Sequence, residues 1–105
     1  MSEELILITH NAADQFVQSR VLAGFESQGE FHLLDQETII EGTSRTYTFL
    51  KTLRDCWPED FKVVINDKEV YLCFYSATND QKAAVTKLLS ACLNEVGIIG
   101  TFEEP

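Results

Sequence analysis

The first apolar run of the chain, residues 5–9, is continuous rather than alternating and is rich in β-branched side chains. A run of this kind predicts a central strand that is buried on both faces of a sheet. After Asn11, which can cap a helix, apolar residues recur at helical spacing over residues 13–25. The chain is therefore expected to begin with a strand and a helix, and Gly24 and Gly29 bracket the exit of that helix.

The middle of the chain carries a β-like run and then a second helical pattern. Residues 31–34 favour a strand, and residues 38–40 either continue this strand or return as the second strand of a hairpin. Beyond the Gly-Thr-Ser of residues 42–44, apolar side chains are spaced as on one face of a helix that Pro58 ends. These apolar side chains are Phe49, Leu50, Leu53, Cys56 and Trp57. We expect a helix here whose apolar face belongs to the core.

The last third of the chain contains the clearest hairpin. Two β-rich runs, residues 61–65 and 70–75, flank a polar stretch that begins Asn-Asp, which suits a tight turn. A helical pattern then continues to Gly97, a residue that readily adopts the left-handed conformation at a helix end. Residues 98–102 resemble a final strand.

These elements follow one another in the order β-α-β-α-β-β-α-β, and one pair of strands is joined by a hairpin. We therefore expect an α+β fold with a mixed, largely antiparallel sheet and about three helices, similar in topology to a ferredoxin-like sandwich with an added helix. Residues 1–105 suffice for one core of ordinary size, so the whole chain is expected to be a single compact domain.

The ends and the cysteines of the chain indicate a cytoplasmic protein. The amino terminus is acidic where a secretory signal is basic, and no apolar stretch approaches the roughly 20 residues of a membrane span. The three cysteines, Cys56, Cys73 and Cys92, form no CxxC pair and no cluster with histidine. Neither a disulfide framework nor a metal site is predicted, and no cofactor is expected.

Charge is the most informative feature of the composition. Seventeen acidic side chains against eight basic ones give a net charge of −9, which opposes binding to nucleic acid or to an anionic membrane. Between Val21 and Ser44 there is no Lys or Arg, although large apolar residues such as Phe31 alternate with carboxylates. The carboxylates of this stretch are Glu26, Glu30, Asp35, Glu37 and Glu41.

Two interpretations of this acidic stretch remain open. It suits a solvated face that keeps the chain soluble. It also suits a surface complementary to a basic protein, on which carboxylates steer association and Phe31 supplies apolar contact. Under the second interpretation, the partner-binding residues are the five carboxylates and Phe31.

Two polar positions are weaker candidates for chemistry. His10 follows the first predicted strand, where sheets often place ligands, but no nucleophile or orienting carboxylate can be assigned beside it. Arg45 lies with three hydroxyl residues at a predicted helix start, a combination that can hold an anion, but the stretch has no nucleotide-binding motif. We therefore expect no enzyme.

The primary hypothesis is a non-enzymatic acidic protein that neutralises a basic protein partner. In gross composition the chain is similar to bacterial immunity proteins, which inhibit toxin nucleases. The alternative is a small structural or self-associating α+β module that forms homo-oligomers. A third hypothesis is a small enzyme that uses His10.

Overall fold

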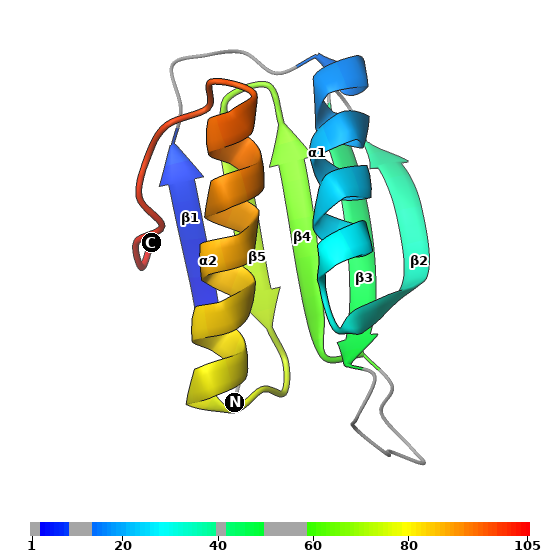
Figure 1. Cartoon of the computed structure of the whole chain (residues 1–105), viewed down its shortest axis with the longest axis vertical. Helices are drawn as coiled ribbons and strands as arrows, with labels where there is room; N and C mark the ends of the chain where they lie inside the picture. The colour runs from blue at the N-terminus through cyan, green and yellow to red at the C-terminus, as the bar shows by residue number, and fades with distance from the viewer. Residues whose placement is uncertain (1–2, 9–13, 40–41, 50–58) are drawn as a thin grey trace.

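The computed structural model describes residues 3–8, 14–39, 42–49 and 59–105, which form an antiparallel sheet with helices packed on one of its faces (Figure 1). In chain order the elements are β1 (Glu3–Ile8), α1 (Gln15–Gln28), β2 (Phe31–Ile39), β3 (Gly42–Phe49), β4 (Phe61–Asn66), β5 (Glu69–Phe74) and α2 (Asn79–Glu95). The predicted α+β class is confirmed, with two helices rather than three in the described part of the chain. Neither helix is long and apolar enough to cross a membrane.

The strands lie in the order β1-β5-β4-β3-β2, and every neighbouring pair is antiparallel. Strands β2 to β5 form a meander, while α1 carries the chain from β1 at one edge to β2 at the other (Figure 1). The ferredoxin-like prediction was therefore wrong in its topology, because no helix separates β2, β3, β4 and β5 along the chain. The described sheet is also wholly antiparallel, not mixed as predicted.

The predicted helix after residues 42–44 is the main error in the expected elements. Gly42–Phe49 is strand β3, paired on one side with β2 and on the other with β4. The sequence Thr-Tyr-Thr-Phe of residues 46–49 alternates polar and aromatic side chains, all of which favour strands. The remainder of the predicted helix, including Leu50, Leu53, Cys56 and Trp57, lies outside the described residues.

The first and last predicted strands also differ from expectation. β1 lies at the edge of the sheet and not at its centre. It is also buried on one face only, because helices cover one face of the sheet: Leu7 is 1% exposed, whereas the next residue, Ile8, is 67% exposed. The predicted strand over residues 98–102 is replaced by a single bridge between Ile6 and Glu103. The Ile6 N–H donates to the Glu103 carbonyl at 2.8 Å, and the Glu103 N–H donates to the Ile6 carbonyl at 2.9 Å.

Local sequence explains the boundaries of the other elements. Asp14 caps α1, its Oδ1 accepting from the Val17 N–H at 2.9 Å, whereas Asn11 lies outside the described residues. In the β4–β5 turn, Asn66 Oδ1 accepts from the backbone N–H groups of Lys68 and Glu69 at 2.9 and 2.8 Å. The predicted hairpin is thus confirmed, with a turn of the kind that asparagine favours.

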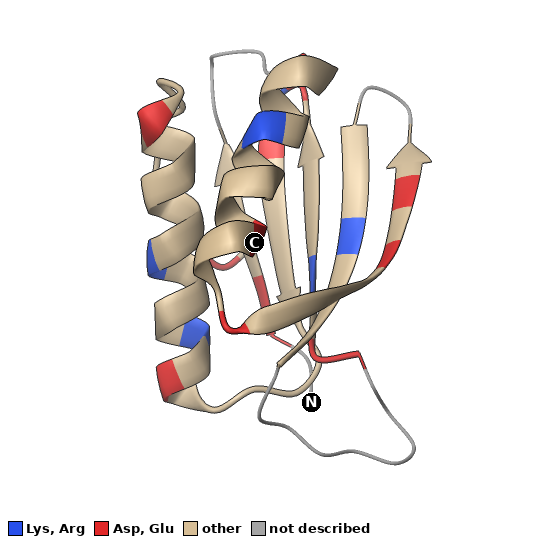
Figure 2. Ribbon diagram, turned by 45° about the vertical axis from the view of Figure 1, so that its right-hand side comes forward, with Lys and Arg blue, Asp and Glu red and all other residues tan. Residues whose placement is uncertain are grey.

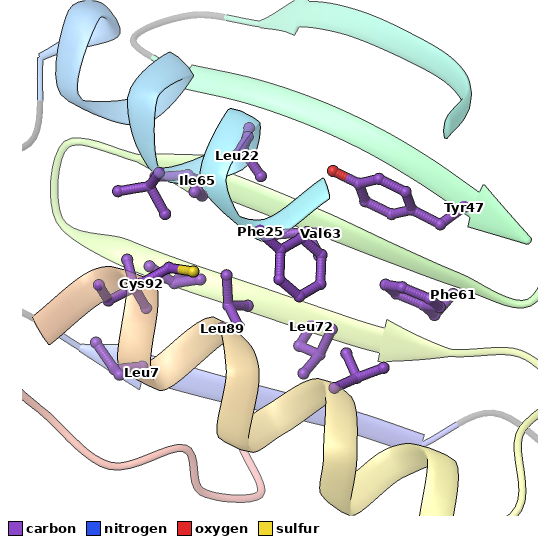
Figure 3. Close-up of a cluster of buried hydrophobic side chains, with 14 of the residues drawn as sticks. Leu7, Leu22, Phe25, Tyr47, Phe61, Val63, Ile65, Leu72, Leu89 and Cys92 are labelled. Carbon is purple, nitrogen blue, oxygen red and sulfur yellow. The ribbon is translucent and has the colours of Figure 1, made fainter. Parts of the chain in front are cut away.

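The core lies between the helices and one face of the sheet (Figure 3). Alternate residues of the strands point into it, and the apolar stripes of α1 and α2 close it. Figure 3 labels the principal side chains: Leu7, Leu22, Phe25, Tyr47, Phe61, Val63, Ile65, Leu72, Leu89 and Cys92. The opposite face of the sheet has no helix over it in the described chain (Figure 1).

Candidate functional site

The alternation of β3 determines which side chains face away from the helices. Arg45 and Tyr47 both reach Glu26 of α1, so they lie on the helix side of the sheet. Ser44 and Thr46 therefore point to the opposite side, which we call the open face.

Register then places two predicted site residues on this open face. Asp35 of β2 lies opposite Thr46, and Glu37 lies opposite Ser44. Residues directly opposite each other on paired strands share a face, so both carboxylates accompany these hydroxyls. Figure 2 shows the acidic positions on β2, at the edge of the sheet.

A shallow hollow of about 190 Å³ lies between these residues and the adjoining ends of the strands. Among the residues that the structure describes, its lining includes the carboxylates of Asp35, Glu37 and Glu59 and one basic residue, Lys62. Three hydroxyl residues, Ser44, Thr46 and Tyr75, and Gln36 also line it. The hollow thus presents an excess of negative charge together with hydrogen-bonding oxygen atoms.

Such a lining suits an ammonium or guanidinium group. Ionised carboxylates accept charge-assisted hydrogen bonds, which are shorter and stronger than neutral ones, and a guanidinium can engage a carboxylate with two of them. Among the residues that the structure describes, no three His, Cys, Asp or Glu side chains are grouped so as to hold a metal ion. The carboxylates and hydroxyls of the hollow thus match the chemistry of a cationic group.

Asp60, next to Glu59, makes hydrogen bonds to the strand ends beside the hollow. Its side chain is buried, and its Oδ2 accepts from the Phe49 N–H at 2.7 Å and from the Thr48 hydroxyl at 3.0 Å. Its backbone carbonyl accepts from the N–H groups of Tyr75 and Ser76 at 2.9 and 3.1 Å. Asp60 therefore joins the ends of β3, β4 and β5 beside the hollow and holds its neighbours Glu59 and Tyr75 in place.

Glu26 lies on the other side of the sheet from Asp35 and Glu37. Its Oε1 accepts from Arg45 Nη1 at 2.6 Å and from the Tyr47 hydroxyl at 2.9 Å. Burial, followed by the adjacent charge of Glu26, raises the pKa of Tyr47 well above its ordinary value. Glu26 is thus compensated within the protein, and the structure does not bring it to the open face.

Phe31 and Glu30, two of the three remaining predicted contacts, are also not brought together with Asp35 and Glu37. Phe31 is 7% exposed and packs on Phe25, with ring centroids 4.6 Å apart, so its side chain belongs to the core. Glu30 lines a separate apolar groove of about 370 Å³ that also contacts α2. Glu41 lies outside the described residues.

Of the weaker sequence candidates for chemistry, Arg45, Cys73 and Cys92 lie within the described residues. Arg45 lies within β3 and pairs with Glu26, so the helix start on which its anion site depended is absent. His10 and Cys56 lie outside the described residues. Cys73 and Cys92 are buried free thiols, as expected, and burial raises the pKa of each.

Sequence reasoning missed six residues of the hollow: Gln36, Ser44, Thr46, Glu59, Lys62 and Tyr75. Gln36 lies between Asp35 and Glu37 on β2, whereas the other five come from three separate stretches of the chain, and only strand register brings them beside Asp35 and Glu37. The alternation of polar and aromatic side chains within residues 42–49 is a signal for a strand, and a strand there would have placed Ser44 and Thr46 on one face.

Comparisons of the chain with protein-family models, with curated proteins and with solved structures found no match.

Proposed function

We propose that this chain is a non-enzymatic, cytoplasmic binding protein that neutralises a basic protein partner, in the manner of an immunity protein that inhibits a toxin nuclease. The observation that carries the proposal is the convergence of Asp35, Glu37 and Glu59 on the open face, around a hollow with one basic residue, Lys62. The surface proposed for the partner is this hollow and the part of β2 beside it.

Overall charge supports the same partner chemistry. A net charge of −9 creates a field that attracts a basic protein over distances of a Debye length, about 8 Å at physiological ionic strength. Local carboxylates then fix the orientation of the partner once the two proteins meet. In the proposal, acidic residues that lie apart in the sequence therefore act together to attract and orient the basic partner.

The arrangement of polar groups favours binding over catalysis. In the part of the chain that the structure describes, the hollow holds carboxylates, hydroxyls, an amide and an ammonium, and neither histidine nor cysteine lines it. A hydroxyl nucleophile would need an adjacent base to activate it. The two described cysteines are buried, Cys92 in the core and Cys73 on the open-face side of β5, and burial raises the pKa of each thiol. Recognition of a cation requires only the oxygen atoms that are present.

Charge reversal tests this proposal once a partner has been recovered by cross-linking in cells and purified. Asp35→Lys combined with Glu37→Lys should raise the dissociation constant about tenfold or more, because lysines would then face basic groups of the partner. The matched control is Glu103→Lys combined with Glu104→Lys, which changes the net charge equally at exposed positions outside the hollow. Equal loss of affinity in both double variants would mean that only general acidity matters and would refute the proposed surface.

A further inference from the structure

The outer side of β2 is the most accessible strand edge in the described chain. β2 ends the strand order, and its residues 32–38 are exposed (Figure 1). At the opposite end of the sheet, the edge of β1 is partly occupied by the two hydrogen bonds between Ile6 and Glu103. An uncovered edge strand presents backbone N–H and C=O groups that can pair with another extended chain.

The second half of β2 is the regular part of this edge. The register with β3 shifts between Leu33 and Asp35 and then runs without interruption from Asp35 to Ile39. Within this regular part, Asp35 and Glu37 point to the open face, while Gln36 and Thr38 alternate with them and point to the helix side. An added strand would therefore meet carboxylates at every second position on one face only.

Charge determines which kind of strand fits. If two copies of β2 paired antiparallel in one continuous sheet, the open faces would coincide and Asp35 and Glu37 of each copy would lie beside those of the other. Like charges on neighbouring strands destabilise the pairing, whereas opposite charges stabilise it. The edge therefore disfavours a second copy of this chain and favours a segment with a basic residue at every second position.

We propose that an extended segment of the basic partner adds to the sheet as a sixth strand at the β2 edge, with lysine or arginine side chains beside Asp35 and Glu37. This inference rests on the proposed function and specifies how the partner is held. Main-chain hydrogen bonds to β2 supply affinity, and the alternate carboxylates supply specificity. A basic side chain on the open face can also reach the oxygen atoms of the adjoining hollow, including those of Ser44 and Thr46.

A short acetylated peptide in which lysine alternates with threonine is the probe. Titrated into the isotope-labelled protein, it should shift the backbone amide resonances of residues 35–39 more than those of β1. Asp35→Asn combined with Glu37→Gln should weaken binding about tenfold, while Glu103→Gln combined with Glu104→Gln, an equal change of charge, should not. A probe that does not bind, or that shifts chiefly β1, would overturn the inference.

A second peptide separates backbone pairing from charge. N-methylation at alternate residues keeps every lysine but removes the N–H donors of one strand edge, so binding should weaken about tenfold or more when the methylated edge faces β2. One outcome is that the methylated and unmethylated peptides bind the wild type equally, while the Asp35→Asn, Glu37→Gln variant binds both poorly. Strand addition would then be wrong, but recognition of a basic partner by the acidic surface would be supported. If instead methylation matters and neutralisation does not, the edge pairs without charge selection and the role proposed for Asp35 and Glu37 fails.

Discussion

Tyr47 is buried beneath α1 and donates its hydroxyl hydrogen to Glu26; its burial, and then the charge of Glu26, raise the pKa of Tyr47, so stability falls at alkaline pH. The folded-state pKa of Tyr47 is raised, so the folded protein holds the phenolic proton after the unfolded chain has released it, above about pH 10. The stabilisation is therefore complete below pH 10 and declines as pH rises above it. Tyr47→Phe should cost about 1 to 2 kcal/mol at neutral pH and should flatten this alkaline decline, measured by urea unfolding across the pH range. Identical pH profiles for the variant and the wild type would contradict this account.

Asp60 offers a second test at the residue scale. Asp60→Ala would leave the Phe49 N–H and the Thr48 hydroxyl without their carboxylate acceptor, and the loss should be about 3 kcal/mol in the free energy of unfolding. The control is the neighbouring Glu59→Ala, which alters an exposed residue and should change stability by no more than about 0.5 kcal/mol. Equal effects from the two substitutions, determined by chemical denaturation, would show that Asp60 does not fix the strand ends.

The acidic residues also show how far sequence reasoning reaches at this scale. A stretch without basic residues drew attention to Asp35 and Glu37, which share one face of β2, but the same stretch contains Glu26, whose charge is met by Arg45 nineteen positions later. Sequence alone does not distinguish an exposed carboxylate from one that is paired across a helix–sheet contact. Phe31 illustrates the same limit, since its neighbours in the core come from α1, β3 and β4.

At the scale of elements, α2 depends on its first turn. The Thr78 hydroxyl oxygen accepts from the Gln81 N–H at 3.1 Å, and the Gln81 side chain accepts from the Thr78 N–H at 2.9 Å. Thr78→Ala removes half of this reciprocal cap and should destabilise the protein by about 1 kcal/mol. Thr78→Ser keeps the oxygen atom and should change stability much less. Thermal unfolding followed by circular dichroism compares the two, and an alanine variant as stable as the serine variant would argue against the cap.

The elements also differ in how well their sequences specify them. Residues 61–74 carry β-rich runs on either side of an Asn-Asp turn, so local chemistry and long-range pairing agree and the hairpin could be predicted. Residues 42–49 carry a helix-like cap sequence followed by strand-forming side chains, so the local signals conflict. Pairing with both β2 and β4 decides the outcome, and such long-range contacts override local propensity.

At the scale of the whole molecule, the fold leads directly to the proposed function. Because α1 and α2 share one face of the sheet, the other face and the β2 edge are left without a covering helix in the described chain (Figures 1 and 2). The apolar stripes of the helices predicted that both helices pack on a sheet, but they contain no information on whether both pack on the same face. The acidic composition was evident from the sequence, whereas the open face that displays it was not.

The measurement that tests the central claim most directly is the rate of association with the purified basic partner as a function of salt. For the wild type, the association rate constant should fall steeply as ionic strength rises to about 0.15 M, because salt screens the field of the acidic face. In the variant that combines Asp35→Asn with Glu37→Gln, association at low salt should be slower and its salt dependence shallower, while Glu103→Gln with Glu104→Gln should follow the wild type. Equal salt dependence in all three proteins would contradict the claim that the open face beside β2 recognises a basic partner.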